Sequence, residues 1–218
     1  VSPDGERIVV LGFAKGKLKV PTGRDTLIMG KPLKKENQET IHFMLCYSKD
    51  GDLKWSNIIH KEVAYNSHLD KIRFGPSGNL YLISVYKDEI KFKGKIIKSE
   101  YENIESIGVF SFDNKGKFQK HLISWKQNSL LHHEIATHHY LQSIELDFDS
   151  NENLYFHGTY IGNLILSEDV QLSSNQFIKA GFLAKYSQDM SLEWQYTFGG
   201  DYGGGTIEDL VFNDKNEL

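Results

Sequence analysis

The chain has 218 residues and a formal net charge of −4, from 25 basic and 29 acidic side chains that are interspersed along it. Its 39% hydrophobic residues and four prolines are typical of a folded globular chain, and the lack of a basic field argues against nucleic acid as a partner. No apolar stretch approaches the roughly 18 residues that span a bilayer, so we expect no membrane insertion, and the single Cys46 excludes an intramolecular disulfide and is expected to be a buried thiol.

The first predicted element is the turn-like segment 1–5, Val-Ser-Pro-Asp-Gly. It carries no signal peptide, and we expect the sequence to be a cut fragment of a longer protein. A second turn follows at 47–55, Tyr-Ser-Lys-Asp-Gly-Asp-Leu-Lys-Trp, where an apolar run gives way to turn residues. These two segments are the landmarks by which the rest of the chain can be divided.

Both landmarks return further along the chain. The segment 74–82, Phe-Gly-Pro-Ser-Gly-Asn-Leu-Tyr-Leu, fits the slot of the first turn, and 112–118, Phe-Asp-Asn-Lys-Gly-Lys-Phe, is a degenerate copy of the second. Between them the apolar residues alternate with period 2, which predicts short half-buried strands joined by tight turns. We place these strands near 69–74, 80–86, 107–112 and 118–124.

A histidine-rich loop follows at 132–139, His-His-Glu-Ile-Ala-Thr-His-His. Imidazole and carboxylate groups are zinc ligands, so His133, Glu134, His138 and His139 are the only metal candidates in the sequence. A zinc-protease helix needs two histidines four residues apart, whereas His133 and His138 are five apart. We therefore predict a solvated loop. Residues 121–141, which include it, are expected to line one loop-rich face together with the inserted hairpins.

The third copy is the clearest of the three. Its first landmark is 148–156, Phe-Asp-Ser-Asn-Glu-Asn-Leu-Tyr-Phe, and its second is 186–194, Tyr-Ser-Gln-Asp-Met-Ser-Leu-Glu-Trp. An insert of about 20 residues at 161–179 has its own apolar alternation and predicts an added β-hairpin. The remaining strands are predicted at 144–148, 154–160, 181–186 and 192–198.

A last copy begins at 212–218, and residues 207–212 are predicted as its innermost strand. The four starts at 1, 74, 148 and 212 lie 73, 74 and 64 residues apart, which is the kind of fixed period that repeat architectures have. We therefore predict a single repeat domain over 1–218, with units at approximately 1–73, 74–147 and 148–211 and the start of the next at 212–218.

The fold class that follows is all-β. Four antiparallel strands per unit correspond to one blade of a β-propeller, and the inserted hairpin accounts for a period longer than that of a simple blade. Three blades are fewer than propellers usually have, so we expect about three four-stranded blades, each with an inserted hairpin, that are part of a larger propeller.

Several of these segments resemble the bacterial β-propeller repeat family known as SBBP. The resemblance is carried by 181–187, 192–194 and 198–200, and by 152–160 and 78–81. The copies depart from the family pattern where Lys120 replaces a tryptophan, Ser84 replaces the glycine seen at Gly158, and Met190 replaces the turn glycine. The resemblance implies an exported or cell-surface bacterial protein whose repeat has no assigned catalytic residues.

Two sets of recurring residues have a structural explanation. Apolar residues that recur at the second landmark are expected to be buried between blades, and Trp55 and Trp194 are expected to pack there rather than to bind a ligand. The recurring turn acids are expected to bond their own backbone, since the dense spacing of a calcium loop is absent. The first set is Tyr47, Phe112, Tyr186, Leu53, Phe118 and Leu192; the second is Asp4, Asp50, Asp113, Asp149, Asp189 and Asp214.

The sequence therefore predicts a non-catalytic binding or scaffold module that presents a loop-rich face to a protein or glycan partner. No cofactor is predicted, and further blades or domains are expected in the full-length chain. The alternative is a metal-assisted hydrolase or lyase whose site lies around His133–His139. A third possibility is a purely structural role in which the module spaces other domains apart.

Overall fold

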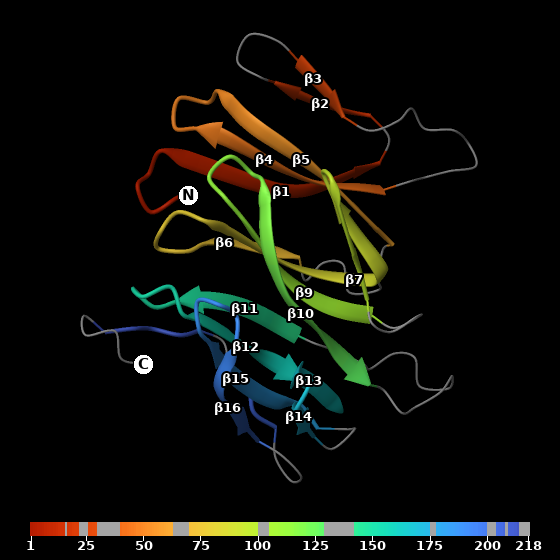
Figure 1. Ribbon diagram of the computed structural model, residues 1–218, viewed down its shortest axis with the longest axis vertical. Helices are drawn as coiled ribbons and strands as arrows, with labels where there is room; N and C mark the ends of the chain where they lie inside the picture. Colours follow the sequence, from red (N-terminus) through yellow and green to blue (C-terminus); the bar gives the residue numbers. More distant parts are fainter. Residues whose placement is uncertain are drawn as a thin grey trace.

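The computed structural model describes residues 1–15, 17–21, 26–29, 40–62, 70–99, 105–128, 142–174, 178–199, 204–207 and 209–213. These residues form curled antiparallel sheets with no helix, so the predicted all-β class is confirmed (Figure 1). No helix long and apolar enough to cross a membrane occurs in this part of the chain.

The first group of strands, which we call meander I, contains β1 (Arg7–Lys15), β4 (Thr40–Ser48) and β5 (Leu53–Glu62). Each strand pairs antiparallel with the next. A hairpin of β2 (Leu18–Pro21) and β3 (Thr26–Met29) is inserted between β1 and β4. Among the described strands, β1 pairs only with β4, so one edge of β1 is open.

The second group, meander II, contains β6 (Lys71–Phe74), β7 (Leu80–Phe92), β9 (Glu105–Phe112) and β10 (Phe118–Asn128), again paired in chain order. The outer half of β7 forms the inserted hairpin with β8 (Lys95–Lys98). The four predicted strands of this region are confirmed, although β7 and β10 run further than expected.

The third group, meander III, has the same order and is drawn in teal and blue in Figure 1. Its strands match the predicted ranges to within two residues, and the predicted hairpin is present in the insert. The four main strands are β11 (Gln142–Phe148), β12 (Leu154–Tyr160), β15 (Ala180–Tyr186) and β16 (Leu192–Phe198), and the hairpin is β13 (Asn163–Ser167) with β14 (Val170–Ser173).

The three meanders share one register. Ile8 pairs with Tyr47, Leu80 with Phe112, and Leu154 with Tyr186. On its other side, each of these aromatic residues pairs with the first residue of the next strand, where the register of that pairing shifts. We call residues at matching places in this register equivalent. The end of one meander also pairs with the inserted hairpin of the next, through His60 opposite Lys91 and Gln127 opposite Leu164.

Of the three core clusters among the described residues, two lie between meanders, on the two faces of meander II, and the third packs Val20 of β2 against β4 within meander I. Side chains point to alternate faces along a strand, so Leu80, Leu82 and Tyr86 of β7 pack in one cluster with residues of meander I. Tyr81, Ile83 and Val85 pack in another cluster with meander III. Burial of each such side chain stabilises the fold by roughly 1.5–3 kcal/mol, and burial also raises the pKa of Tyr81 to about 12.

Five described turns have the same backbone hydrogen bonds. In the turn after β9, for example, the Gly116 N–H donates to the Asp113 carbonyl, and the Asp113 N–H donates to the Lys117 carbonyl. The fourth residue of each turn has a positive φ, and this residue is a glycine at 51, 78 and 116 but Glu152 and Met190 in meander III.

Four of the six predicted turn acids, Asp4, Asp113, Asp149 and Asp189, bond their own turn, while Asp214 lies outside the described residues. Asp149 accepts the N–H groups of Asn151 and Asn153 at 3.0 and 2.9 Å, and Asp113 does the same for Lys115 and Lys117 at 2.9 Å each. The side chain of Asp4 likewise accepts the N–H of Glu6. These interactions hold the loops between strands in a fixed shape.

Two further predictions, one on Cys46 and one on the segment 207–212, are also resolved. Cys46 is buried, and this burial raises the pKa of its thiol. The described part of 207–212 is not a strand, because none of the described strands lies beside it to form a ladder. Its Phe212 ring instead packs against Tyr155 with ring centroids 4.8 Å apart.

Candidate binding cleft between meanders I and II

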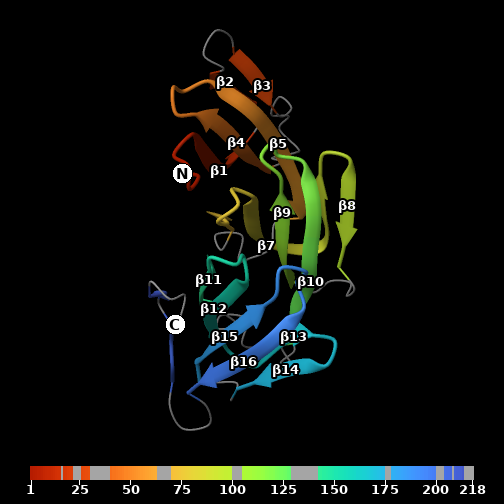
Figure 2. The same cartoon turned by 60° about the vertical axis from the view of Figure 1, so that its left-hand side comes forward.

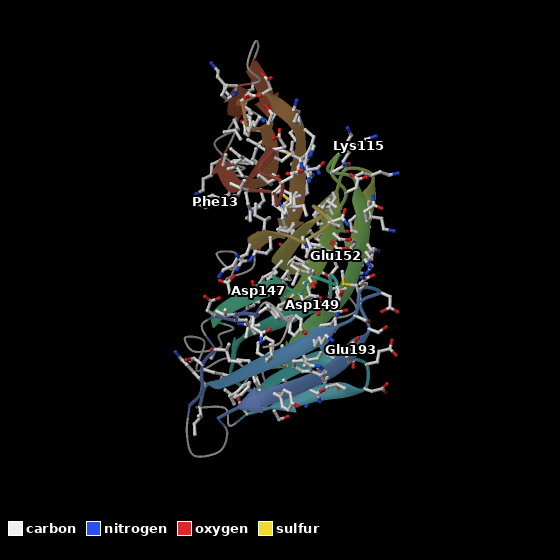
Figure 3. The ribbon with its side chains drawn as sticks, turned by 90° about the vertical axis from the view of Figure 1, so that its left-hand side faces the viewer. Phe13, Lys115, Asp147, Asp149, Glu152 and Glu193 are labelled. Carbon is white, nitrogen blue, oxygen red and sulfur yellow. The ribbon has the colours of Figure 1, made fainter. Side chains whose placement is uncertain are left out.

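A cleft of about 500 Å³ lies where meanders I and II meet. One wall is β5, through Trp55 and Asn57. The opposite wall is the turn 113–117 with Phe112 and Phe118, and the tip of the β7–β8 hairpin closes the third side. Figure 3 shows Lys115 of this turn on the side of the molecule away from Phe13.

The floor of the cleft is aromatic. Phe92 is buried and stacks on the half-buried Phe118 with centroids 5.8 Å apart, and it meets Phe112 edge-on at 5.2 Å. Trp55 is half-buried and lines the same space. Such a surface offers a rigid apolar platform because aromatic rings lose little conformational freedom on binding.

Trp55 is held in place by the turn of the next meander. Its indole Nε1 donates to the Asn114 carbonyl at 3.2 Å, and the neighbouring Asn57 side chain donates to the Gly116 carbonyl at 2.6 Å. A Cβ added at Gly116 would lie 2.5 Å from the indole ring, so the backbone and the ring are in close contact. The predicted packing role of Trp55 between neighbouring units is confirmed, and the residue also lines the cleft.

Four lysines surround this floor. Lys93 and Lys95 come from the hairpin tip, Lys115 and Lys117 come from the turn, and all four are exposed. The described lining contains no carboxylate. Asp113, the acid in the same turn, has its Oδ1 engaged by two backbone N–H groups and its Oδ2 by Gln119, so the cleft presents net positive charge.

The equivalent place between meanders II and III has the opposite charge. The tip of its β13–β14 hairpin carries Glu168 and Asp169 in place of the lysine-bearing tip, and its turn carries Asp189 in place of Lys115. Packing between meanders therefore does not require lysines at the hairpin tip or in the middle of the turn, although Lys120 bonds the Gln188 carbonyl at this second junction. The cluster of four exposed lysines distinguishes the first cleft from it.

A buried polar network that the sequence did not reveal lies nearby. The Lys61 ammonium, which is fully buried, contacts both Asp70 carboxylate oxygens at 2.7 and 2.5 Å and also bonds Ser84 Oγ at 2.9 Å. Ser84 donates to Asp70 at 3.0 Å, and His42 Nδ1 lies 3.5 Å from the same carboxylate. These contacts satisfy the buried charges, and they link β4, β5 and β7 to the residue preceding β6.

A second set of charged residues joins β6 and β11, the first strands of meanders II and III. Lys71 pairs with Glu145, and Arg73 pairs with Asp147 at 3.2 Å. The buried His157 also contacts Asp147, at 3.1 Å. Asp147 lies where the second and third meanders meet (Figure 3), so these pairs contribute to the junction rather than to the cleft.

The residues singled out for metal binding, His133, Glu134, His138 and His139, lie outside the described residues. Within the described ranges, no group of three or more His, Cys, Asp or Glu side chains is arranged to hold a metal ion. The prediction about this loop therefore stays a prediction.

No protein-family model matches the chain, and neither the curated proteins nor the solved structures contain a match. The function has to be argued from the geometry of the cleft.

Proposed function

We propose that this chain is a non-catalytic binding module, built as a segment of a β-propeller of the SBBP type, and that it binds an acidic glycan in the cleft between meanders I and II. The propeller is supported by the shared strand order and register of the meanders and by their face-to-face packing around meander II. An exported or cell-surface location would fit a module of this kind.

The lining of the cleft is the observation that carries the choice of ligand. A sugar ring has an apolar face that can lie on Trp55 or Phe118, and carboxylate or sulfate groups at its edge would meet Lys93, Lys95 and Lys115. Charge-assisted hydrogen bonds of this sort are stronger than neutral ones. A neutral glycan would leave the lysines unused, which is why we favour an acidic one.

The enzyme alternative, a metal-assisted hydrolase or lyase, depends on His133, Glu134, His138 and His139 alone. The cleft does not favour it, because the described lining contains lysines and aromatic rings but no carboxylate to act as a general acid or base. The binding role therefore has the better support.

Binding can be tested by calorimetry with oligosaccharides of uronic acids and with neutral glucans of the same length. We expect binding of the acidic series only, weakening as ionic strength rises, because salt screens exposed charges. The double substitution Lys115→Glu and Lys117→Glu should reduce the affinity at least tenfold, which corresponds to about 1.4 kcal/mol.

The matched control is Lys17→Glu with Lys19→Glu, which makes the same change in net charge at exposed positions away from the cleft. This control should bind as the unchanged protein does. Equal losses in both double variants would show a nonspecific charge effect, and equal binding of neutral and acidic sugars would contradict the proposed ligand.

A further inference from the structure

His121 extends the aromatic floor of the cleft. It lies on β10, the strand that begins at Phe118, and its ring centroid is 6.4 Å from that of Phe118 and 6.4 Å from that of Phe110. Phe118 itself lines the cleft and stacks on Phe92. The imidazole therefore stands just outside the cleft lining, where it continues the row of rings along β10.

The same imidazole lies near one of the four cleft lysines. Lys95 of β8 pairs with Phe92 of β7, and its ammonium group is close enough to His121 to lower the pKa of the imidazole. Figure 2 shows β8 and β10 on the same side of the molecule. His121 is exposed to solvent, so an acidic group that binds Lys95 also lies near the imidazole.

Two effects favour the neutral imidazole in the unliganded protein. The larger is burial and the smaller is the charge of Lys95, and both lower the pKa of His121 from the ordinary value of 6.5. Among the described residues, Lys95 is the charged group that acts on it, since the rings that it contacts on β9 and β10, Phe110 and Phe118, are uncharged. An anion bound beside Lys95 would oppose these effects, because a nearby negative charge favours the protonated form.

The strand register does not require an imidazole at this position. The equivalent residues are Ser56 in meander I and Gln195 in meander III, which stand at the same place in the pairing of the last two strands. Neither of these side chains changes its charge near neutral pH. Of the three equivalent positions, the one that can do so lies beside the lysine-bearing hairpin.

We infer that His121 is a further ligand-binding residue of this cleft and makes it pH-dependent: as an imidazolium it joins Lys95 in binding one acidic group of the glycan. An imidazolium has two N–H donors, and one of them donates to a carboxylate or sulfate oxygen. The proton and the glycan then each bind more tightly when the other is present. The inference rests on the proposed function, and it adds that binding strengthens as the solution becomes more acidic.

Calorimetry with a sulfated oligosaccharide at about pH 5 and about pH 8 tests this, because sulfate groups and lysines keep their charge over this range whereas histidines do not. We expect the unchanged protein to bind about tenfold more tightly at the lower pH, the order of one charge-assisted hydrogen bond. His121→Gln should remove this difference and keep the weaker affinity. His121→Lys should bind at both pH values as the unchanged protein binds at the lower one.

Proton uptake gives a second measurement that does not depend on affinity alone. Calorimetry at about pH 6 in two buffers of different ionisation enthalpy should show that binding takes up protons, since the bound anion favours the imidazolium. His121→Gln should lose most of this uptake. Circular dichroism melts check that each variant folds.

The matched control is His60→Gln, which removes an exposed histidine of β5 outside the cleft lining. This control should retain both the pH dependence and the proton uptake. Equal affinity of the unchanged protein at the two pH values, or a pH dependence that survives in His121→Gln, would overturn this inference and leave the proposed function standing. No binding by the unchanged protein at either pH would overturn both.

Discussion

At the scale of single residues, the turn glycines allow the positive φ that the turns between strands require. Gly51 and Gly116 occupy the same place in equivalent turns, with φ of 89° and 73°. Nothing lies within 4 Å of a Cβ at Gly51, whereas a Cβ at Gly116 would meet the Trp55 ring. A substitution at Gly51 therefore measures the cost of backbone strain alone, whereas one at Gly116 measures backbone strain together with steric contact.

We predict that Gly51→Ala lowers the free energy of unfolding by about 1 kcal/mol, the usual cost of a left-handed backbone for a residue with a Cβ. Gly116→Ala should cost clearly more, because the methyl group also displaces the indole. Urea unfolding of the two variants measures the difference. Equal losses would mean that the Trp55 contact adjusts without cost.

Residue types alone were sufficient to predict these turns. Gly, Asn and Asp favour turns through their own backbone conformation and through hydrogen bonds to residues nearby in the chain. The segments 47–55 and 186–194 could therefore be recognised as turns without knowledge of their tertiary contacts. The places of Glu152 and Met190 were harder, since neither residue type is typical of a positive φ. Only the match to the other copies indicated that Met190 stands at a turn position.

At the scale of elements, the strands were predictable and their side-chain networks were not. Alternation predicted half-buried strands, and the strands are present, but residues 80–86 of β7 and all of β12 are buried on both faces. The pairing of Lys61 with Asp70 leaves no trace in the sequence, because Lys61 lies on β5, Asp70 lies just before β6, and no regular spacing relates the two. The lysine cleft was missed for the same reason, since its walls come from three separate elements.

We predict that Asp70→Asn lowers the free energy of unfolding by about 3–5 kcal/mol, because it removes the carboxylate charge that contacts the buried Lys61 ammonium. Adding Lys61→Met should recover much of this loss, since the buried positive charge is then gone. The three variants complete a double-mutant cycle with the unchanged protein. Additive losses in the double variant would show that the two side chains act independently.

At the scale of the whole molecule, each meander contacts its neighbours and little else. Meander II is covered on both faces, by the cluster around Met44 on one side and the cluster around Phe156 on the other. Within the part of the chain that the structure describes, meanders I and III each pack against one other meander. Stability in structures of this type is approximately a sum of unit and interface contributions.

We therefore predict that hydrogen exchange is slowest in β7 and β9 and faster in β1 and β16. Mass spectrometry of exchanged peptides under native conditions measures this order, since local opening follows how well each region is packed. If β1 exchanged as slowly as β9 at low protein concentration, the molecule would be opening as one cooperative unit.

The opposite charges at the two junctions have a further consequence. Lys115 and Asp189 stand at the same place in turns that have the same backbone hydrogen bonds, and those bonds involve neither side chain. Under the proposed binding role, recognition would depend on side chains of this loop and folding on its backbone. Exchange of a few side chains would then change the ligand while the framework stays the same.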